Sequence, residues 1–296
     1  MTIVAGLSAR GNGPAPLHLA AELSRCTGDR IIAVAIIERP WPRRTLDPVE
    51  GEYLNYLVAH AKKSLKTMVE QLPGDLDVWQ MVHQATSIPE GLTEIAAEMS
   101  ADVVVVGSSS SGLLGRIALG SVTDRLVHTA AVPVAIAPRG YPAHAGRIER
   151  LTVAYGGQAD EVGLVATSAE LARRWSTRLR ITSFTVRPVT MFGGSIEPAA
   201  EDLVVNQWAL RTQEGIADQL EKVRSSIDTL VAEVVIGAGP SWRDAVDAVE
   251  WGPGDILVLG SGAAGPAAQV FLGSAAARIL RHSPVPTMIV PRREKA

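Results

Sequence analysis

The chain has 296 residues, a length that predicts two domains of ~150 residues each. Its 28 Lys and Arg residues nearly balance its 31 Asp and Glu residues, and 47% of the chain is hydrophobic, which excludes a general nucleic-acid binder and a disordered chain. Cys26 is the only cysteine, and no apolar run approaches the ~18 residues of a membrane span. We therefore expect a cytoplasmic protein that binds neither nucleic acid nor membranes.

Strand and helix patterns alternate along the first half of the chain. Apolar runs predict buried strands at residues 2–6, 30–38, 76–82, 102–107 and 133–137. Helical periodicity lies between them, at residues 16–26, 48–71, 89–99 and 119–128. This alternation is typical of parallel βαβ units.

The second half repeats the pattern, with strands expected at residues 151–155, 179–186, 230–236, 255–260 and 286–290. Continuous apolar runs such as residues 103–106 indicate sheets that are covered on both faces. The predicted fold is α/β, with two tandem doubly wound domains over residues 1–146 and 147–296. Each domain would hold a five-stranded parallel sheet of order 3-2-1-4-5, whose ligand site lies between strands 1 and 4.

An internal repeat supports the two-domain interpretation. Residues 102–139 and 255–292 align without a gap at an offset of 153, and 14 of their 38 positions are identical. A period this long exceeds that of a solenoid repeat and indicates two copies of one domain.

Each copy carries a glycine-rich loop after its fourth strand. The first loop runs from Gly107 to Gly112 and is followed by Gly120-Ser121 at the start of a helix. The second runs from Gly260 to Gly265 and is followed by Gly273-Ser274. Glycines let a phosphate approach the backbone, and a helix N-terminus offers free amides to an anion. The alternative is that these residues only form a turn and cap a helix.

Enzyme signatures are few. Gly260, Gly262 and Gly265 match the dinucleotide fingerprint G-x-G-x-x-G after a strand. Only 31 residues follow Gly265, however, and no acidic residue stands ~20 positions further on to hold a ribose. The six histidines show no metal-ligand spacing, and we expect neither a metal site nor a catalytic residue. An NAD- or ATP-dependent enzyme stays as the distant alternative.

These features together resemble the universal stress protein family, in a tandem form. The family motif G-x2-G-x9-G-[ST] appears as Gly107-x2-Ser110-x9-Gly120-Ser121 and as Gly260-x2-Ala263-x9-Gly273-Ser274. The resemblance implies an adenine nucleotide alpha hydrolase-like fold. It also implies a non-catalytic stress-response signalling protein that binds ATP, with Mg²⁺, at this loop.

Two departures from the family pattern bear on that function. Ser110 and Ala263 replace the second glycine of the motif, and no aspartate ends the first strand. A gap-free alignment of the two starts puts Leu7 and Gly156 at the aspartate position, and a one-residue shift puts Gly6 there. Loss of one charge-assisted hydrogen bond costs about 1.5–3 kcal/mol, or about ten- to a hundredfold in affinity.

The candidate nucleotide-binding residues lie in both halves. In the first half they are Gly6, Leu7, Ile36, Gly107, Ser109, Ser110, Gly120, Ser121, Val122 and Thr123. In the second half they are Gly156, Gly260, Gly262, Ala263, Gly273 and Ser274. The first loop is the better candidate because it has four serines and Arg116, whereas the second loop has no basic side chain.

The fifth strands, residues 132–137 and 285–290, would be apolar sheet edges unless something pairs with them. In the family that the chain resembles, strand 5 of one domain pairs with strand 5 of another, and a tandem chain would satisfy this internally. We also expect a homodimer through a further surface. Two hypotheses stay open: a weak adenine-nucleotide binder, and the same fold acting as a protein-interaction module without nucleotide.

Overall fold

A computed structural model gives the structure of the chain. It describes residues 2–8, 13–39, 48–156, 163–186, 198–224, 231–264 and 269–291. Gly265 of the dinucleotide-like pattern lies outside the described residues.

The elements of the first half alternate as the sequence predicts. They are β1 (Thr2–Leu7), α1 (Ala15–Thr27), β2 (Arg30–Glu38), α2 (Pro48–Val69), β3 (Val78–Ala85), α3 (Ile88–Glu98), β4 (Val103–Gly107), α4 (Ser121–Thr129) and β5 (Val134–Ala137).

The second half follows the same order and adds one hairpin. Its elements are β6 (Arg150–Ala154), α5 (Leu164–Trp175), β7 (Arg178–Val186), α6 (Pro198–Arg224), β8 (Ala232–Gly239), α7 (Trp242–Asp247), β9 (Asp255–Gly260), β10 (Gly262–Ala264), β11 (Gln269–Phe271), α8 (Ser274–His282) and β12 (Thr287–Val290).

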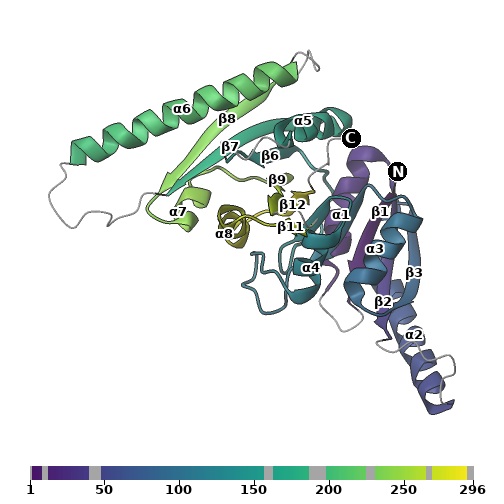
Figure 1. Cartoon of the computed structure of the whole chain (residues 1–296). Helices are drawn as coiled ribbons and strands as arrows, with labels where there is room; N and C mark the ends of the chain where they lie inside the picture. The colour runs from purple at the N-terminus through teal and green to yellow at the C-terminus, as the bar shows by residue number, and fades with distance from the viewer. Residues whose placement is uncertain are drawn as a thin grey trace.

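One sheet runs through both halves (Figure 1). Its 10 strands have the order β3-β2-β1-β4-β5-β12-β9-β6-β7-β8. Neighbouring strands are parallel within each half, and β5 pairs with β12 antiparallel, with Ala135 opposite Met288. The predicted α/β class with a mainly parallel sheet is confirmed. The β5–β12 pairing means that each of these two strands has a neighbour on both sides.

Local sequence signals set several element ends. Gly28 ends α1 in a left-handed conformation (φ 71°), and its amide donates to the carbonyl of Ser24. Ser87 begins α3 because its side chain accepts a hydrogen bond from the Glu90 amide, and Ser241 does the same for α7 with Asp244.

Two strands and one loop differ from the predicted elements: β8, expected at residues 230–236, spans Ala232–Gly239. β3 begins at Val78 rather than residue 76 and extends to Ala85, because it pairs with β2 as far as Glu38. The glycine-rich loop after β9 was expected without regular structure, but it contains the antiparallel hairpin β10–β11. Gly262 pairs there with Phe271, a contact between residues that the local pattern does not connect.

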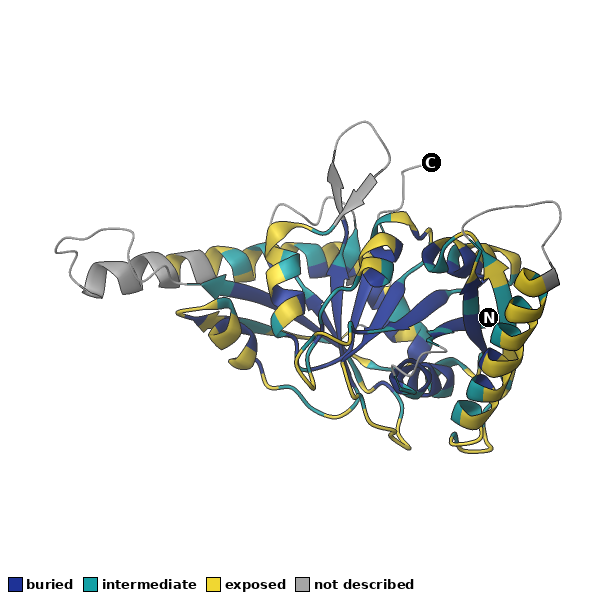
Figure 2. Ribbon diagram, turned by 90° about the horizontal axis from the view of Figure 1, so that it is seen from below, coloured by how far each residue is buried: buried dark blue, intermediate teal, exposed yellow. Residues whose placement is uncertain are grey.

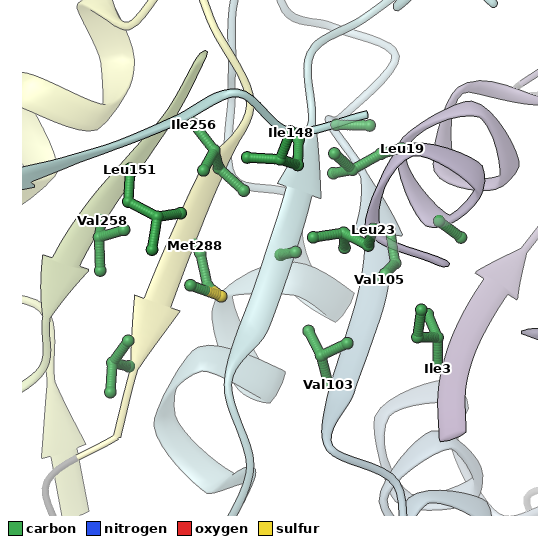
Figure 3. Packing of buried hydrophobic residues seen from close by; sticks show 14 of the residues in the cluster. Ile3, Leu19, Leu23, Val103, Val105, Ile148, Leu151, Ile256, Val258 and Met288 are labelled. Carbon is green, nitrogen blue, oxygen red and sulfur yellow. The ribbon is translucent and has the colours of Figure 1, made fainter. Parts of the chain in front are cut away.

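Helices cover both faces of the sheet, so that its central strands are buried (Figure 2). The cluster on the side of α1, α2, α5 and α6 is continuous across the β5–β12 junction (Figure 3). Ile3 and Val105 from the first half belong to it, as do Leu151, Ile256 and Met288 from the second. The two halves therefore share one hydrophobic core.

Candidate functional site

A pocket lies at the carboxyl ends of β1 and β4, where the chain connections leave the sheet in opposite directions. It encloses about 220 Å³. The lining residues are Gly6, Leu7, Ser8, Gly13, Pro16, Val34, Ile36, Ile88, Leu92, Val106, Gly107, Ser108, Ser109, Ser110, Gly120, Ser121, Val122 and Thr123. This set includes all 10 candidate residues that the sequence identifies in the first half.

Hydrogen bonds fix the loop that follows β4. The Ser108 amide donates to the carbonyl of Ala137 on β5 at 2.9 Å, and the Ser109 amide donates to Ala118 at 2.8 Å. The Ser108 hydroxyl also accepts the Ala118 amide at 2.8 Å. The hydroxyl oxygens of Ser109 and Ser111 lie 2.9 Å apart, at hydrogen-bonding distance. The protein itself therefore holds the loop in place.

The N-terminus of α4 faces the same pocket. Its N-cap residue, Gly120, makes no side-chain capping bond, and the first intrahelical bond runs from the Asp124 amide to the Gly120 carbonyl. The amides of Ser121, Val122 and Thr123 precede that bond and have no acceptor within the helix. The Thr123 hydroxyl donates to the carbonyl of Gly107 at 3.2 Å and ties the helix start to the end of β4. This arrangement suits an anion.

Apolar side chains form the remainder of the wall. Leu92 of α3 lies so close to Gly6 that a Cβ atom at residue 6 would stand 2.9 Å from it. A side chain at residue 6 would therefore require the end of Leu92 to shift. Val34 and Ile36 from β2 and Val106 from β4 complete a surface suited to a planar apolar group.

No lining residue of this pocket is ionisable. Leu7, 7% exposed, stands where the resemblance places an aspartate, and it packs in the core on the α1 and α2 side of the sheet. Among the described lining residues, attraction for an anion therefore comes from backbone amides and hydroxyl groups.

Arg116 does not serve the pocket as the sequence suggested. Its guanidinium donates to the carbonyl of His282 at the end of α8 and lies 3.5 Å from the carboxylate of Asp247. Both acceptors belong to the second half. The arginine turns away because the backbone at Gly115 and Arg116 hydrogen-bonds with Arg139, which directs the side chain toward the other half.

The sheet register corrects the alignment of the two strand starts. Ile3 lies opposite Val103, and Leu151 lies opposite Ile256, the residue aligned with Val103 in the repeat. Ile3 and Leu151 are therefore equivalent, so the counterpart of Leu7 is Tyr155 and not Gly156. Gly156 was wrongly assigned because two short apolar segments can be aligned one residue out of register, and only the pairing with neighbouring strands fixes the register.

The second half keeps the backbone hydrogen bond and the glycine contact that position the loop after the fourth strand of the first half. The Ser261 amide donates to Val290 at 3.1 Å, as Ser108 does to Ala137. Gly260 lies against Leu164, as Gly107 lies against Pro16.

The remaining second-half candidates are placed as follows. Gly273 is the N-cap residue of α8 and makes no side-chain capping bond, and Ser274 is exposed at the helix start. Gly262 and Ala263 lie in β10, and Gly156 is exposed after β6.

Comparisons with known proteins identify the family. The model of the universal stress protein family matches residues 1–138 and 147–291. A universal stress protein of Mycobacterium tuberculosis is 35% identical over 297 residues, covering 98% of this chain and 100% of the relative. One from Mycobacterium bovis matches with the same identity and coverage. The chain belongs to the universal stress protein family.

A solved structure shows the shared fold. The universal stress protein of Archaeoglobus fulgidus DSM 4304 superposes with a TM-score of 0.59 at 14% identity, covering 99% of this chain and 98% of that one. Within the described residues of this universal stress protein, no helix is long and apolar enough to span a membrane. Over the same residues, no group of His, Cys, Asp and Glu side chains has the arrangement of a metal site.

Several lining residues of this universal stress protein were not among the candidates. Ile88 and Leu92 come from α3, and Val34 precedes Ile36 on the same face of β2. Ser108 follows Gly107 directly. The helix start after β3 was a usable signal, because every helix that follows a parallel strand begins at the carboxyl edge of the sheet.

Proposed function

We propose that this universal stress protein binds an adenine nucleotide in the pocket between β1 and β4. It acts as a non-catalytic signalling protein of the stress response. The observation that carries the proposal is that all 10 first-half candidates line one pocket. The phosphates would lie against the amides of Ser121, Val122 and Thr123, and the adenine against the apolar wall formed by β2 and α3.

The size of the pocket supports partial enclosure of the ligand. Its volume of about 220 Å³ is below the ~300–1,000 Å³ typical of small-molecule sites. We infer that one phosphate and part of the nucleoside are enclosed, and that the terminal phosphates of ATP extend outward. AMP and ATP should therefore bind with similar affinities.

The chemistry of the lining supports binding rather than catalysis. A general acid or base needs a titratable side chain in reach of the substrate, and none is found among the lining residues that the structure describes. With no carboxylate among the described lining residues, Mg²⁺ would be carried by the phosphate oxygens, and the serine and threonine hydroxyls of the pocket would be its protein ligands. The single cysteine supports a reducing compartment, and we propose the cytoplasm.

A matched pair of substitutions tests the site. Ser121 and Ser274 are each the first residue of a helix, directly after an N-cap glycine, and both are exposed. A glutamate in the first turn stabilises a helix through its favourable interaction with the helix dipole, so both variants should fold. At Ser121 it also repels phosphate, and we expect calorimetric affinity for ATP to fall at least ~30-fold. Ser274→Glu should change affinity less than ~2-fold. Equal effects of the two variants would place binding elsewhere.

Leu7→Asp tests the missing carboxylate. An aspartate here would accept charge-assisted hydrogen bonds, and we expect affinity to rise about ten- to a hundredfold. Leu7→Asn is the neutral control of the same shape and should gain less. Because Leu7 is buried, the melting temperature of both variants is measured in parallel.

The second candidate function is protein–protein interaction by the same fold without a bound nucleotide. It is favoured if wild-type protein binds no nucleotide while Leu7→Asp does, and if the supernatant of denatured wild type contains no ATP, ADP or AMP. The pairing of β5 with β12 supports it, because it leaves the outer helices and edge strands for partners. The first partner that we propose is a second copy of the chain, in a homodimer.

A further inference from the structure

The outer face of α2 carries an exposed aromatic stripe. Val49, Tyr53 and Tyr56 are 73%, 62% and 65% exposed, and their spacing of four and three residues puts them in one line along the helix. His60 continues the line and stacks on Tyr56 with ring centroids 6.3 Å apart. These four residues are called the α2 stripe.

The buried contacts of α2 with the sheet lie away from the α2 stripe. The opposite side of α2 packs on the sheet, through the buried residues Ala61 and Leu65 and the partly buried Leu54 and Val58. The helix lies at one end of the molecule, over β2 and the edge strand β3, and extends beyond the sheet (Figure 1). Figure 2 shows its outward side as mostly exposed.

Charge is segregated along the same helix. Glu50 and Glu52 lie near its start, and Lys62, Lys63 and Lys66 lie in its last third. No charged residue occurs between residues 53 and 61. If two copies of α2 pack in parallel, like charges meet at both ends. If they pack antiparallel, acidic residues face basic residues at both ends, and the aromatic centres meet.

We propose that the α2 stripe is the interface of the homodimer, with α2 of two copies packed antiparallel about a twofold axis near Leu57. This surface deepens the homodimer proposed above. The axis brings Glu52 of one copy within a turn of Lys63 of the other, and Tyr53 within a turn of His60, because Glu52 and Lys63 flank the stripe on the same side of the helix. Twofold symmetry makes every such contact occur twice. A single helix pair is a small interface, so the dissociation constant should be on the order of 10 µM or weaker.

Sedimentation velocity over about 1–300 µM protein measures the association. Wild type should shift from monomer to dimer, and Tyr56→Glu should weaken dimerisation at least ~10-fold. Leu210→Glu is the matched control, because Leu210 is 58% exposed on the other long outer helix, α6. It should leave the dimer unchanged. Circular dichroism checks that both variants fold.

A charge swap tests the antiparallel geometry. Glu52→Lys and Lys63→Glu should each weaken the dimer, and the double variant should restore it. Failure of the double variant to restore association overturns the geometry. A dimer that survives Tyr56→Glu, or that is lost in Leu210→Glu, overturns the surface while the homodimer stands. A strictly monomeric wild type overturns both and leaves the stripe to another kind of partner.

Discussion

The two halves share their strand order and the backbone hydrogen bonds of the loop after the fourth strand, but they differ in side chains. Each has its strands in the same order, and each anchors the loop after its fourth strand by a serine amide bonded to the fifth strand. The side chains around this shared backbone have diverged. Leu7 in the first half corresponds to Tyr155 in the second. A duplicated fold thus preserves backbone hydrogen bonds while its side chains take on different tasks.

The amino edge of the sheet shows the largest difference. Asp255 is 2% exposed and accepts two hydrogen bonds from Arg150, at 2.8 and 2.7 Å. Arg180, 1% exposed, lies 3.6 Å from the same carboxylate. The equivalent Asp102 is partly exposed and meets Arg174 at 3.3 Å.

The largest effect is therefore expected for Asp255→Asn. It removes the buried carboxylate that faces both arginines and leaves Arg150 with the exposed Glu233 at 3.6 Å, so the free energy of unfolding should fall by about 3–5 kcal/mol. Asp102→Asn removes only a partly exposed pair and should cost about 1 kcal/mol or less. Urea unfolding monitored by tryptophan fluorescence gives both values. Similar losses of unfolding free energy in the two variants would show that Asp255 and Asp102 contribute equally to stability.

A second contrast concerns equivalent glutamates on α1 and α5. Glu22 is 1% exposed and accepts a hydrogen bond from the Tyr141 hydroxyl at 3.0 Å. Burial raises the pKa of Glu22 to about 7, against opposing effects of Tyr141 and Arg25. Glu170, its counterpart, is exposed, and a hydrogen bond from Arg173 lowers its pKa. Tyr141 belongs to the linker between the halves, so the linker buries one glutamate only.

Glu22 should make stability depend on pH. Its pKa is higher in the folded chain than in the unfolded one, so the folded state binds the proton more tightly. The stabilisation is complete below pH ~4.5 and is lost as the pH rises through ~7, with an amplitude of about 3 kcal/mol. Glu22→Gln should abolish this slope, and Glu170→Gln should leave it intact. Thermal melts between pH 4.5 and 8 measure it, and an unchanged slope in Glu22→Gln contradicts the assignment.

The smallest effect is expected for Arg116→Ala. Arg116 links the first-half loop to α7 and α8, whereas the aligned residue in the second half is Gln269. Loss of this partly exposed contact should cost about 1 kcal/mol. Hydrogen exchange should rise in residues 108–120 and at the end of α8, with nucleotide affinity changed less than ~3-fold. A large loss of affinity would mean that the arginine contacts the phosphate after all.

Much of the first-half site was predictable from the sequence. Gly107, Gly120 and Ser121 follow from the motif after an apolar strand, and Leu7 follows from the end of β1. Leu92 was missed because its place in the pocket depends on how α3 packs against Gly6. The direction of Arg116 was missed because its partners come from the other half.

The sequence by itself determined the order of strands and helices, the duplication and the Gly-Ser helix starts. These depend on periodicity and on short spacings within the chain. Only the tertiary structure decided the antiparallel register of β5 on β12, the place of Tyr155 opposite that of Leu7 in the repeat and the burial of Glu22 by the linker. The reason is that register, burial and side-chain direction are fixed by contacts between residues more than a hundred positions apart.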